Sequence, residues 1–198
     1  MIIEENIQTE PLAKVAEILK KSENLNLTDW NAMNIATVSA KNIPSSRIVL
    51  LKKINDDGLV FYTNFNSKKG KDLDSNKSIA VNFWWRELQE QIRIEGEVEK
   101  LSAEKSDEYF NTRPLKSRVA AIVSQQSETI ESYEILQKEI DDLTAQFELN
   151  KENPTRPEHC GLYLVKPKYI ELWKEGDFRA HQRQKYIKKD DKTWDSTF

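Results

Sequence analysis

The chain has very little cysteine, no long apolar run and no surplus of charge of either sign. Cys160 is the only cysteine among 198 residues, which excludes an internal disulfide and offers no metal-ligand spacing. No apolar run approaches the roughly 20 residues of a membrane-spanning helix. Residues 1–6 lack the basic and apolar regions of a secretory signal. We therefore expect a cytoplasmic protein with no metal site and no membrane partner.

Charged residues make up 32 % of the sequence, yet the net charge is only −3. Non-specific nucleic-acid binding needs a surplus of positive charge, so we expect no nucleic-acid partner. The sequence also lacks the motifs of zinc proteases, serine hydrolases, P-loop proteins and dinucleotide-binding proteins. These absences leave a balanced, globular protein whose function must be sought in scattered polar residues.

The spacing of apolar residues predicts a mainly β protein of the α+β class. Strands are predicted at residues 33–38, 47–53, 59–64, 79–84, 91–101, 162–173 and 184–187. Helices are predicted at residues 11–21, 67–76, 103–112, 115–123 and 130–149. Asp56-Asp57-Gly58 predicts a hairpin between two strands. We expect an antiparallel barrel with peripheral helices, in a single domain over residues 1–198 with a helical segment at 1–28 and a helical insertion at 102–149.

Tyr109, Arg113 and Ser117 follow one another at intervals of four residues. If this segment is helical, the three side chains share one face. An arginine supplies a forked donor, and two hydroxyl groups add neutral hydrogen bonds. Such a set is suited to a phosphate monoester.

A second set of cations lies earlier in the chain. Arg47 and Lys52 belong to an apolar strand, and alternation places them on opposite faces. They either serve different sites or are charges at the ends of a strand. Ser67 is a candidate helix cap, and Lys68 and Lys69 in the first turn would oppose the helix dipole unless an anion lies there. The alternative is that Lys68 and Lys69 are ordinary surface lysines. This second set of phosphate-type ligands, together with the set around Arg113, predicts two phosphorylated small molecules.

A third set contains Arg179, His181 and Arg183, which an extended chain would place on one side. His181 could move a proton or hydrogen-bond a substrate, and the two arginines would favour its neutral form. Gln91 begins a predicted strand, and its amide could bind a planar heterocycle. An exposed glutamine without a ligand is the alternative.

Five ordered segments resemble the pyridoxine/pyridoxamine 5'-phosphate oxidase family over about residues 30–187. The segments are Arg47 to Lys52, Phe61 to Asn64, Tyr109 to Pro114, Ser124 to Ser127 and Arg179 to Arg183. The resemblance implies an FMN-binding split barrel, an antiparallel Greek-key barrel with peripheral helices. It also implies a homodimer with active sites at the subunit interface. One departure is Lys68, which stands where the family commonly has arginine.

The resemblance further implies a reaction and its residues. Pyridoxine 5'-phosphate and pyridoxamine 5'-phosphate would be oxidised to pyridoxal 5'-phosphate by O2, which yields H2O2 and, from the amine, NH3; this is the final step of vitamin B6 cofactor synthesis and salvage. FMN would be bound by Arg47, Ile48, Val49, Leu50, Tyr62, Thr63, Lys68, Lys69, Gln91, Gln126, Ser127, Trp173 and Arg183. The substrate would be bound by Lys52, Tyr109, Arg113, Ser117, Arg179 and His181, of which Arg179 and His181 would be catalytic.

Two other functions are compatible with the same fold. One is a flavin oxidase of the phenazine pathway, although a substrate without a phosphate has no use for Lys52, Tyr109, Arg113 and Ser117. The other is a protein that binds flavin or pyridoxal phosphate without catalysis, which the presence of Arg179 and His181 disfavours.

Overall fold

The computed structural model describes residues 1–124, 126–130, 132–190 and 193–198. Gln125, in one of the five family segments, and Glu131, in the last predicted helix, lie outside the described residues. The chain divides into two compact units. The first contains Met1–Phe61, Asp72–Glu99 and Tyr163–Phe198, and the second contains Tyr62–Lys71 and Lys100–Leu162. The single domain expected over residues 1–198 stays a prediction.

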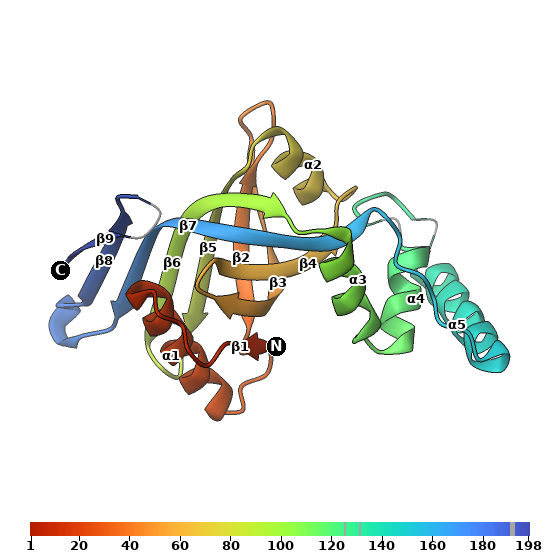
Figure 1. The fold of residues 1–198 in the computed structure, drawn as a ribbon, viewed down its shortest axis with the longest axis horizontal. Coiled ribbons are helices and arrows are strands. Elements are labelled where there is room, and N and C mark those ends of the chain that lie inside the picture. Colours follow the sequence, from red (N-terminus) through yellow and green to blue (C-terminus); the bar gives the residue numbers. More distant parts are fainter. Residues whose placement is uncertain (125, 131, 191–192) are drawn as a thin grey trace. The chain divides into compact units, whose positions relative to one another are not determined.

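Six of the described strands form an antiparallel barrel (Figure 1). They are β2 (Ala32–Val38), β3 (Pro44–Asn55), β4 (Gly58–Asn64), β5 (Ser78–Trp85), β6 (Glu90–Lys100) and β7 (Cys160–Lys174). The strand order is β3-β2-β5-β6-β7, and β4 pairs with both β3 and β7, which closes the barrel. This barrel confirms the predicted fold class. Val, Ile, Phe and Tyr, which favour strands, are frequent in most of these segments.

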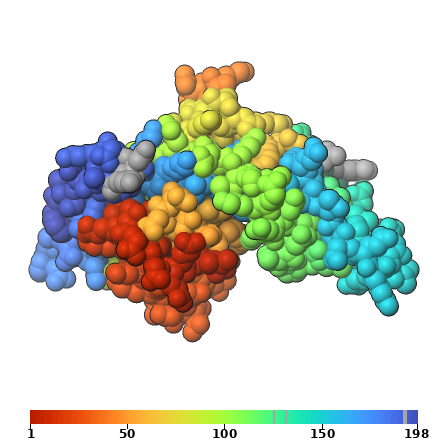
Figure 2. All heavy atoms as spheres, viewed as in Figure 1, coloured from red at the N-terminus to blue at the C-terminus, as the bar shows by residue number. Residues whose placement is uncertain are grey.

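Three short strands extend the sheet. β1 (Ile2–Ile3) runs parallel to β3, and β8 (Gln182–Lys188) and β9 (Trp194–Thr197) follow β7 in the strand order. Strands of two and four residues are too short for alternation to reveal, so β1 and β9 were not predicted. Figure 2 shows the amino-terminal segment in red beside the carboxy-terminal strands in blue, where Lys14 Nζ donates to Gln184 Oε1 at 3.2 Å.

The core of the first unit follows the predicted alternation. In β6, Ile92, Ile94 and Val98 are buried, whereas Arg93 and Glu95 are exposed. The helix α1 (Glu10–Asn24) adds a second apolar layer, because its buried side chains recur at helical spacing. These buried side chains are Leu12, Val15, Ile18 and Leu19.

The predicted hairpin between β3 and β4 is confirmed. Asn55 pairs with Gly58 across a two-residue turn. Gly58 has a φ of +139°, a conformation that favours glycine, and a Cβ at this position would lie 2.0 Å from the carbonyl oxygen of Val165. Both the turn and the close approach of β7 therefore require glycine.

The remaining helices are α2 (Lys68–Ser75), α3 (Ala103–Asn111), α4 (Leu115–Val123) and α5 (Tyr133–Asn150). Ser102 caps α3 by accepting from the N–H of Lys105 at 3.4 Å, and Ser132 caps α5 by accepting from Ile135 at 3.1 Å. The cap explains why α5 begins later than the predicted residue 130. None of the helices in the described part of the chain is long and apolar enough to cross a membrane.

The division into two helices predicted at 103–112 and 115–123 is confirmed, so the condition under which Tyr109, Arg113 and Ser117 would share one helical face is not met. α3 ends at Asn111, and α4 begins at Leu115 after Pro114. Proline lacks an N–H and disfavours helical geometry in the residue before it, so the chain turns at this point. Tyr109 and Ser117 therefore belong to different helices, with Arg113 in the connection.

Candidate functional site

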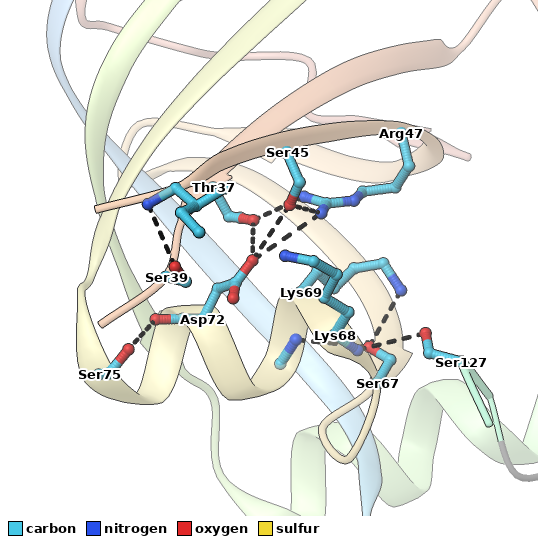
Figure 3. A network of polar contacts seen from close by, with 12 residues as sticks. Thr37, Ser39, Ser45, Arg47, Ser67, Lys68, Lys69, Asp72, Ser75 and Ser127 are labelled. Atoms are coloured by element: carbon cyan, nitrogen blue, oxygen red, sulfur yellow. Dashed lines mark hydrogen bonds and ion pairs between the residues drawn. The ribbon is translucent and has the colours of Figure 1, made fainter. Parts of the chain in front are cut away.

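Arg47 lies on β3 in the first unit, within a network of polar side chains (Figure 3). Its Nη1 donates to Thr37 Oγ1 at 2.7 Å, and its Nη2 donates to Ser45 Oγ at 2.6 Å. Both hydroxyl groups donate in turn to Asp72 Oδ2, at 2.7 and 3.2 Å. Asp72 Oδ2 also lies 4.0 Å from Arg47 Nη2. Three side chains thus fix the orientation of the guanidinium.

Burial governs the electrostatics of this network. The side chain of Arg47 is 20 % exposed and that of Asp72 only 6 %. Removal from water lowers the pKa of Arg47, and the negative charge of Asp72 acts in the opposite direction. Because an arginine stays protonated in proteins, the result is a fixed positive fork, which is suited to binding a phosphate.

The rest of the segment from Arg47 to Lys52 alternates as predicted. Ile48 and Leu50 are exposed, at 62 % and 36 %, whereas Val49 is half-buried. β3 continues to Asn55, so Lys52 lies within the strand, at the bulge where the register with β4 shifts. Ile48 and Leu50, two of the residues assigned to the cofactor, therefore offer apolar surface on the face opposite to Arg47.

Two hollows lie in the first unit near these residues. One of about 730 Å³ is lined by Ile48, Asn82 and Trp84, among others, and one of about 340 Å³ is lined by Asn82 and Arg93. Gln91 Nε2 donates to Asn82 Oδ1 at 2.7 Å. The structure therefore places Gln91 beside an amide that borders both hollows.

Trp173 and His181 lie together at the end of β7. Their ring centroids are 4.7 Å apart, and the ring of Trp84 lies 5.9 Å from that of Trp173. The N–H of Gly176 donates to His181 Nδ1 at 3.4 Å. In a neutral imidazole this bond assigns the proton to Nε2, which becomes a donor.

The prediction that Arg179, His181 and Arg183 alternate along an extended chain is wrong. Asp177–Arg179 forms a 3-10 turn, which Ala180 closes by donating to the carbonyl oxygen of Asp177 at 2.9 Å. Arg179 has a φ of 66°, and β8 begins only at Gln182. Of the three residues only Arg183 belongs to a strand, where it pairs with Trp173; the exposed Arg179 is presented by the turn.

The second unit brings together three residues assigned to the cofactor. Lys69 Nζ donates to Thr63 Oγ1 at 3.1 Å, to Ser67 Oγ at 3.1 Å and to Gln126 Oε1 at 2.8 Å. Lys69 is only 7 % exposed. The Lys69 ammonium group is therefore oriented by three side-chain oxygen atoms, and a cation held in this way is suited to an anion.

The amino-terminal end of α2 adds backbone donors to this cluster. Ser67 Oγ accepts from the N–H of Gly70 at 3.4 Å, which confirms the predicted cap. The N–H of Lys68 donates to Ser127 Oγ at 3.2 Å (Figure 3). A helix N-terminus carries a partial positive charge, and two lysines in its first turn are favourable only where negative charge compensates them.

Tyr62, Tyr109 and Arg113 form another cluster in the second unit. The rings of Tyr62 and Tyr109 lie 5.1 Å apart, and the Arg113 guanidinium lies 4.8 Å from the centre of the Tyr62 ring. Tyr62 Oη and Arg113 Nη1 are buried and have no hydrogen-bond partner among the described residues. Burial raises the pKa of both phenols, so they remain donors at neutral pH.

Arg156 supports the same region from the loop before β7. Its Nε donates to Asp107 Oδ1 at 2.6 Å, and its Nη1 donates to the carbonyl oxygen of Cys160 at 2.5 Å. The Arg156 side chain is 9 % exposed. It ties α3, which carries Tyr109, to the start of β7. Ser117 lies in the first turn of α4, where its N–H donates to the carbonyl oxygen of Pro114 at 2.9 Å.

Sequence reasoning missed Asp72, Arg156 and Glu171, which hold the predicted ligands in place. Glu171 accepts from Arg183 Nη1 at 3.1 Å. The sequence did mark Glu171, because it is the one acid in the apolar run from Tyr169 to Trp173. A charged residue at a position that alternates with two aromatic residues is unusual. No comparable signal marks Asp72 or Arg156 in a chain so rich in charged residues.

The barrel places this chain in a structural class with solved members. PhzG from Burkholderia lata, solved with tetrahydrophenazine-1-carboxylic acid, matches with a TM-score of 0.87 and 25 % identity over 94 % of this chain and 90 % of that one. A pyridoxamine 5'-phosphate oxidase-related, FMN binding protein from Nostoc punctiforme matches with a TM-score of 0.75 at 15 % identity, over 93 % and 94 %. The fold is the split barrel of this class.

Two family models match the chain. The model described as pyridoxamine 5'-phosphate oxidase matches residues 19–147, and one described as the pyridoxine 5'-phosphate oxidase C-terminal dimerisation region matches residues 161–198. A pyridoxine/pyridoxamine 5'-phosphate oxidase of Thermosynechococcus vestitus is 42 % identical over 96 % of this chain and 89 % of the relative. One of Nostoc punctiforme is 46 % identical over 85 % and 78 %. The chain belongs to the pyridoxamine 5'-phosphate oxidase family and is an oxidoreductase.

Proposed function

We propose that the protein is an FMN-dependent oxidase that converts pyridoxine 5'-phosphate and pyridoxamine 5'-phosphate to pyridoxal 5'-phosphate. O2 is the acceptor, H2O2 is a product, and the amine also consumes water and releases NH3. The observation that carries the proposal is the buried Nη1 of Arg113, which lacks a partner among the described residues beside two protonated tyrosines. A buried donor of this kind is costly unless a ligand satisfies it.

The phosphate of the substrate binds to Arg113 and Tyr109 in this proposal, with Lys52 and Ser117 as further ligands. A guanidinium offers two parallel N–H groups to phosphate oxygens, and a phenol adds a neutral hydrogen bond. Arg113 is already held against the Tyr62 ring, so less conformational entropy is lost when a ligand binds.

The residues assigned to FMN fit that group by their chemistry. The forked guanidinium of Arg47 and the ammonium group of Lys69 each have the chemistry to bind a phosphate. Bound FMN supplies the hydride acceptor of the reaction. The proposed ligands are Arg47, Ile48, Val49, Leu50, Tyr62, Thr63, Lys68, Lys69, Gln91, Gln126, Ser127, Trp173 and Arg183.

Arg179 and His181 are the proposed catalytic residues, in contact with the pyridine ring. His181 Nδ1 accepts from the N–H of Gly176, so Nε2 is the donor that can bind and orient the substrate. Arg179 is exposed on a tight turn, so its guanidinium can reach a ligand without displacing packed side chains. Correct alignment of the reacting carbon is what these two residues contribute to the rate.

A homodimer with active sites at the subunit interface is part of the proposal. It is supported by the match of residues 161–198 to a family model described as a dimerisation region. It is also supported by the exposure of Ile48, Leu50 and Trp84, which a partner subunit could cover.

The likeness to PhzG favours a second candidate, an oxidase acting on a phenazine precursor without a phosphate. A guanidinium can pair with a carboxylate as well as with a phosphate, so Arg113 alone does not separate the two candidates, and the substrate must be tested directly. Oxidation of tetrahydrophenazine-1-carboxylic acid, and not of a vitamin B6 phosphate, would favour the second candidate.

The proposal is tested with purified protein that has been saturated with FMN. Pyridoxal 5'-phosphate and H2O2 are measured with pyridoxine 5'-phosphate, with pyridoxamine 5'-phosphate and with unphosphorylated pyridoxine as the matched control. The expected result is equimolar product and H2O2 from both phosphorylated compounds, and turnover of pyridoxine reduced by at least about a hundredfold because a charged anchor is lost. No turnover of either phosphorylated compound would refute the proposal.

A further inference from the structure

Glu171 is a buried carboxylate at the centre of a polar cluster in the first unit. It is 2 % exposed and lies in β7 between Tyr169 and Trp173 in the alternation. Its Oε1 accepts from Arg183 Nη1 at 3.1 Å and from Arg93 Nη1 at 3.3 Å, and its Oε2 accepts from Tyr169 Oη at 2.9 Å. Three strands, β6, β7 and β8, each supply part of the cluster.

The carboxylate of this cluster is far more buried than the two arginines that bind it. Glu171 is almost completely enclosed, whereas the side chains of Arg93 and Arg183 are 45 % and 48 % exposed. A carboxylate removed from water must be compensated by charge-assisted hydrogen bonds, so its two arginines are bound firmly. Each guanidinium is anchored to Glu171 through Nη1, and Nη2 of Arg93 also lies 3.8 Å from Glu95 Oε1.

Among the described residues, Glu171 is the one acid that pairs with Arg183. Its neighbour across the strands is Trp173, which pairs with it in register. A half-exposed arginine loses substantial rotamer entropy when it is ordered, and a ligand must supply that free energy if the protein has not already done so. A fixed Arg183 is therefore a better ligand than a mobile one.

We infer that Glu171 is a positioning residue, which holds the guanidinium of Arg183 in place for the bound flavin. The inference rests on the proposed function, because it needs Arg183 to be a flavin ligand. Glu171 itself is buried beneath the arginines and acts only through them. Arg93 also donates to Glu171 but borders the hollow of about 340 Å³ and is not a proposed flavin ligand. Replacing Arg93 therefore tests the stability of the cluster, whereas replacing Arg183 tests flavin binding.

The test is a double-mutant cycle read by FMN binding to the full-length protein. Dissociation constants come from quenching of FMN fluorescence for the wild type, Glu171→Gln, Arg183→Met and the double variant. Glu171→Gln is expected to weaken binding about tenfold or more, the value of a lost charge-assisted hydrogen bond. In the Arg183→Met background the same substitution should change the constant by less than about twofold, because the residues act as one unit.

Two control variants separate positioning from general damage. Glu97→Gln removes an exposed carboxylate that pairs with Lys168 on the same sheet, and Arg93→Met removes the other arginine of the cluster. Both should leave the FMN dissociation constant within about twofold of the wild type. If Glu171→Gln does not fold, Glu171→Asp replaces it in the cycle, because a carboxylate shortened by one methylene keeps its charge but retreats from Arg183.

Each outcome is decisive. Equal weakening by the Glu171 substitution in both backgrounds would mean a structural role and would overturn the inference, as would unchanged FMN binding. A wild type that does not bind FMN would refute the proposed function itself, and the inference with it. Tight binding by the wild type together with an additive cycle would refute only the inference.

Discussion

Arg47 and Arg113 are both partly enclosed arginines proposed to bind phosphates, yet their surroundings differ. Arg47 donates to two hydroxyl groups that in turn donate to Asp72. Arg113 lies on the ring of Tyr62, and its Nη1 is buried without a hydrogen-bond partner among the described residues. The contacts of Arg47 should therefore stabilise the fold even without a ligand, whereas Arg113 keeps a buried donor that a ligand could satisfy.

This difference in hydrogen bonding shows how arginine can bind a resident cofactor in one place and a substrate that enters and leaves in another. A guanidinium in a complete network contributes to stability even without ligand, which suits a resident cofactor. A guanidinium with an unsatisfied donor contributes little to stability and gains most when a ligand arrives, which suits a substrate that must bind and leave. Four predictions test this contrast.

Replacing Arg113 should have the largest effect, and only on substrate binding. For Arg113→Met we expect the dissociation constant for pyridoxine 5'-phosphate to rise by a factor corresponding to about 2–4 kcal/mol, because a forked charged contact is lost. The FMN dissociation constant and the unfolding free energy should change by less than about 1 kcal/mol, the value of the cation–π contact. Lys116→Met, which removes an exposed cation of α4, is the matched control; equal loss of both ligands would contradict the assignment.

Replacing Arg47 should instead destabilise the protein in the absence of any ligand. Arg47→Ala removes the cation beside Asp72, which is 6 % exposed, so we expect a loss of about 2–3 kcal/mol in the unfolding free energy. Urea unfolding of the FMN-free protein measures this loss. Arg47→Lys keeps the charge without the fork and should lose less; a loss below about 0.5 kcal/mol for the alanine variant would show that the network is not structural.

Arg156 extends the comparison to a residue that the proposal gives no ligand. Arg156→Ala breaks the bond to Asp107 and leaves the carbonyl oxygen of Cys160 without this donor. We expect a loss of about 1–3 kcal/mol in the unfolding free energy, the value of a buried charge-assisted bond. Lys116→Ala, in α4, is the control, because Lys116 and its partner Asp141 are both exposed. A variant as stable as the control would contradict the role of Arg156.

Replacing Asp56 should have the smallest effect on the unfolding free energy, and this effect should depend on pH. Its Oδ1 accepts from the backbone N–H groups of Thr9 at 2.7 Å and Gln8 at 2.9 Å, and the bond from Thr9 chiefly holds its pKa below the ordinary value. Asp56→Ala should lower the unfolding free energy by about 0.5–1 kcal/mol at pH 7, as for a lost helix cap. Asp57→Ala, in the same hairpin, should change little.

The sign of the pH dependence follows from the lowered pKa of Asp56. A group with a depressed pKa stabilises the fold above its unfolded pKa of about 3.9, and the stabilisation disappears as pH falls through the folded value. The difference between wild type and Asp56→Ala should therefore be constant from pH 7 to about pH 5 and shrink below about pH 4. A difference that grows on acidification would contradict the assignment.

The sequence predicted the barrel well because its information is local. Alternation in β6 and the Asp56-Asp57-Gly58 turn depend on neighbouring residues only, and both are confirmed. Local patterns also failed where two rules competed. The four-residue spacing of Tyr109, Arg113 and Ser117 would place them on one face only in a continuous helix, and the chain turns between α3 and α4. Regular spacing around His181 suggested an extended chain, but the turn at Asp177–Arg179 intervenes.

The partners of the supporting residues could not be predicted, because they are distant in the sequence. Glu171 and Arg93 are 78 residues apart, and Arg156 and Asp107 are 49 apart. Only the closed barrel and the docked loop bring such pairs together. The resemblance named the ligand residues, which stay a prediction, whereas the side chains that hold them became visible only in three dimensions.

The measurement that tests the central claim most directly is the visible absorbance of the FMN-loaded protein without oxygen. Addition of pyridoxine 5'-phosphate should bleach the flavin, air should restore the colour, and pyridoxal 5'-phosphate should form in an amount equal to the flavin bleached. Unphosphorylated pyridoxine at the same concentration should leave the flavin oxidised. A flavin that binds but stays oxidised with both phosphorylated compounds would contradict the oxidase function.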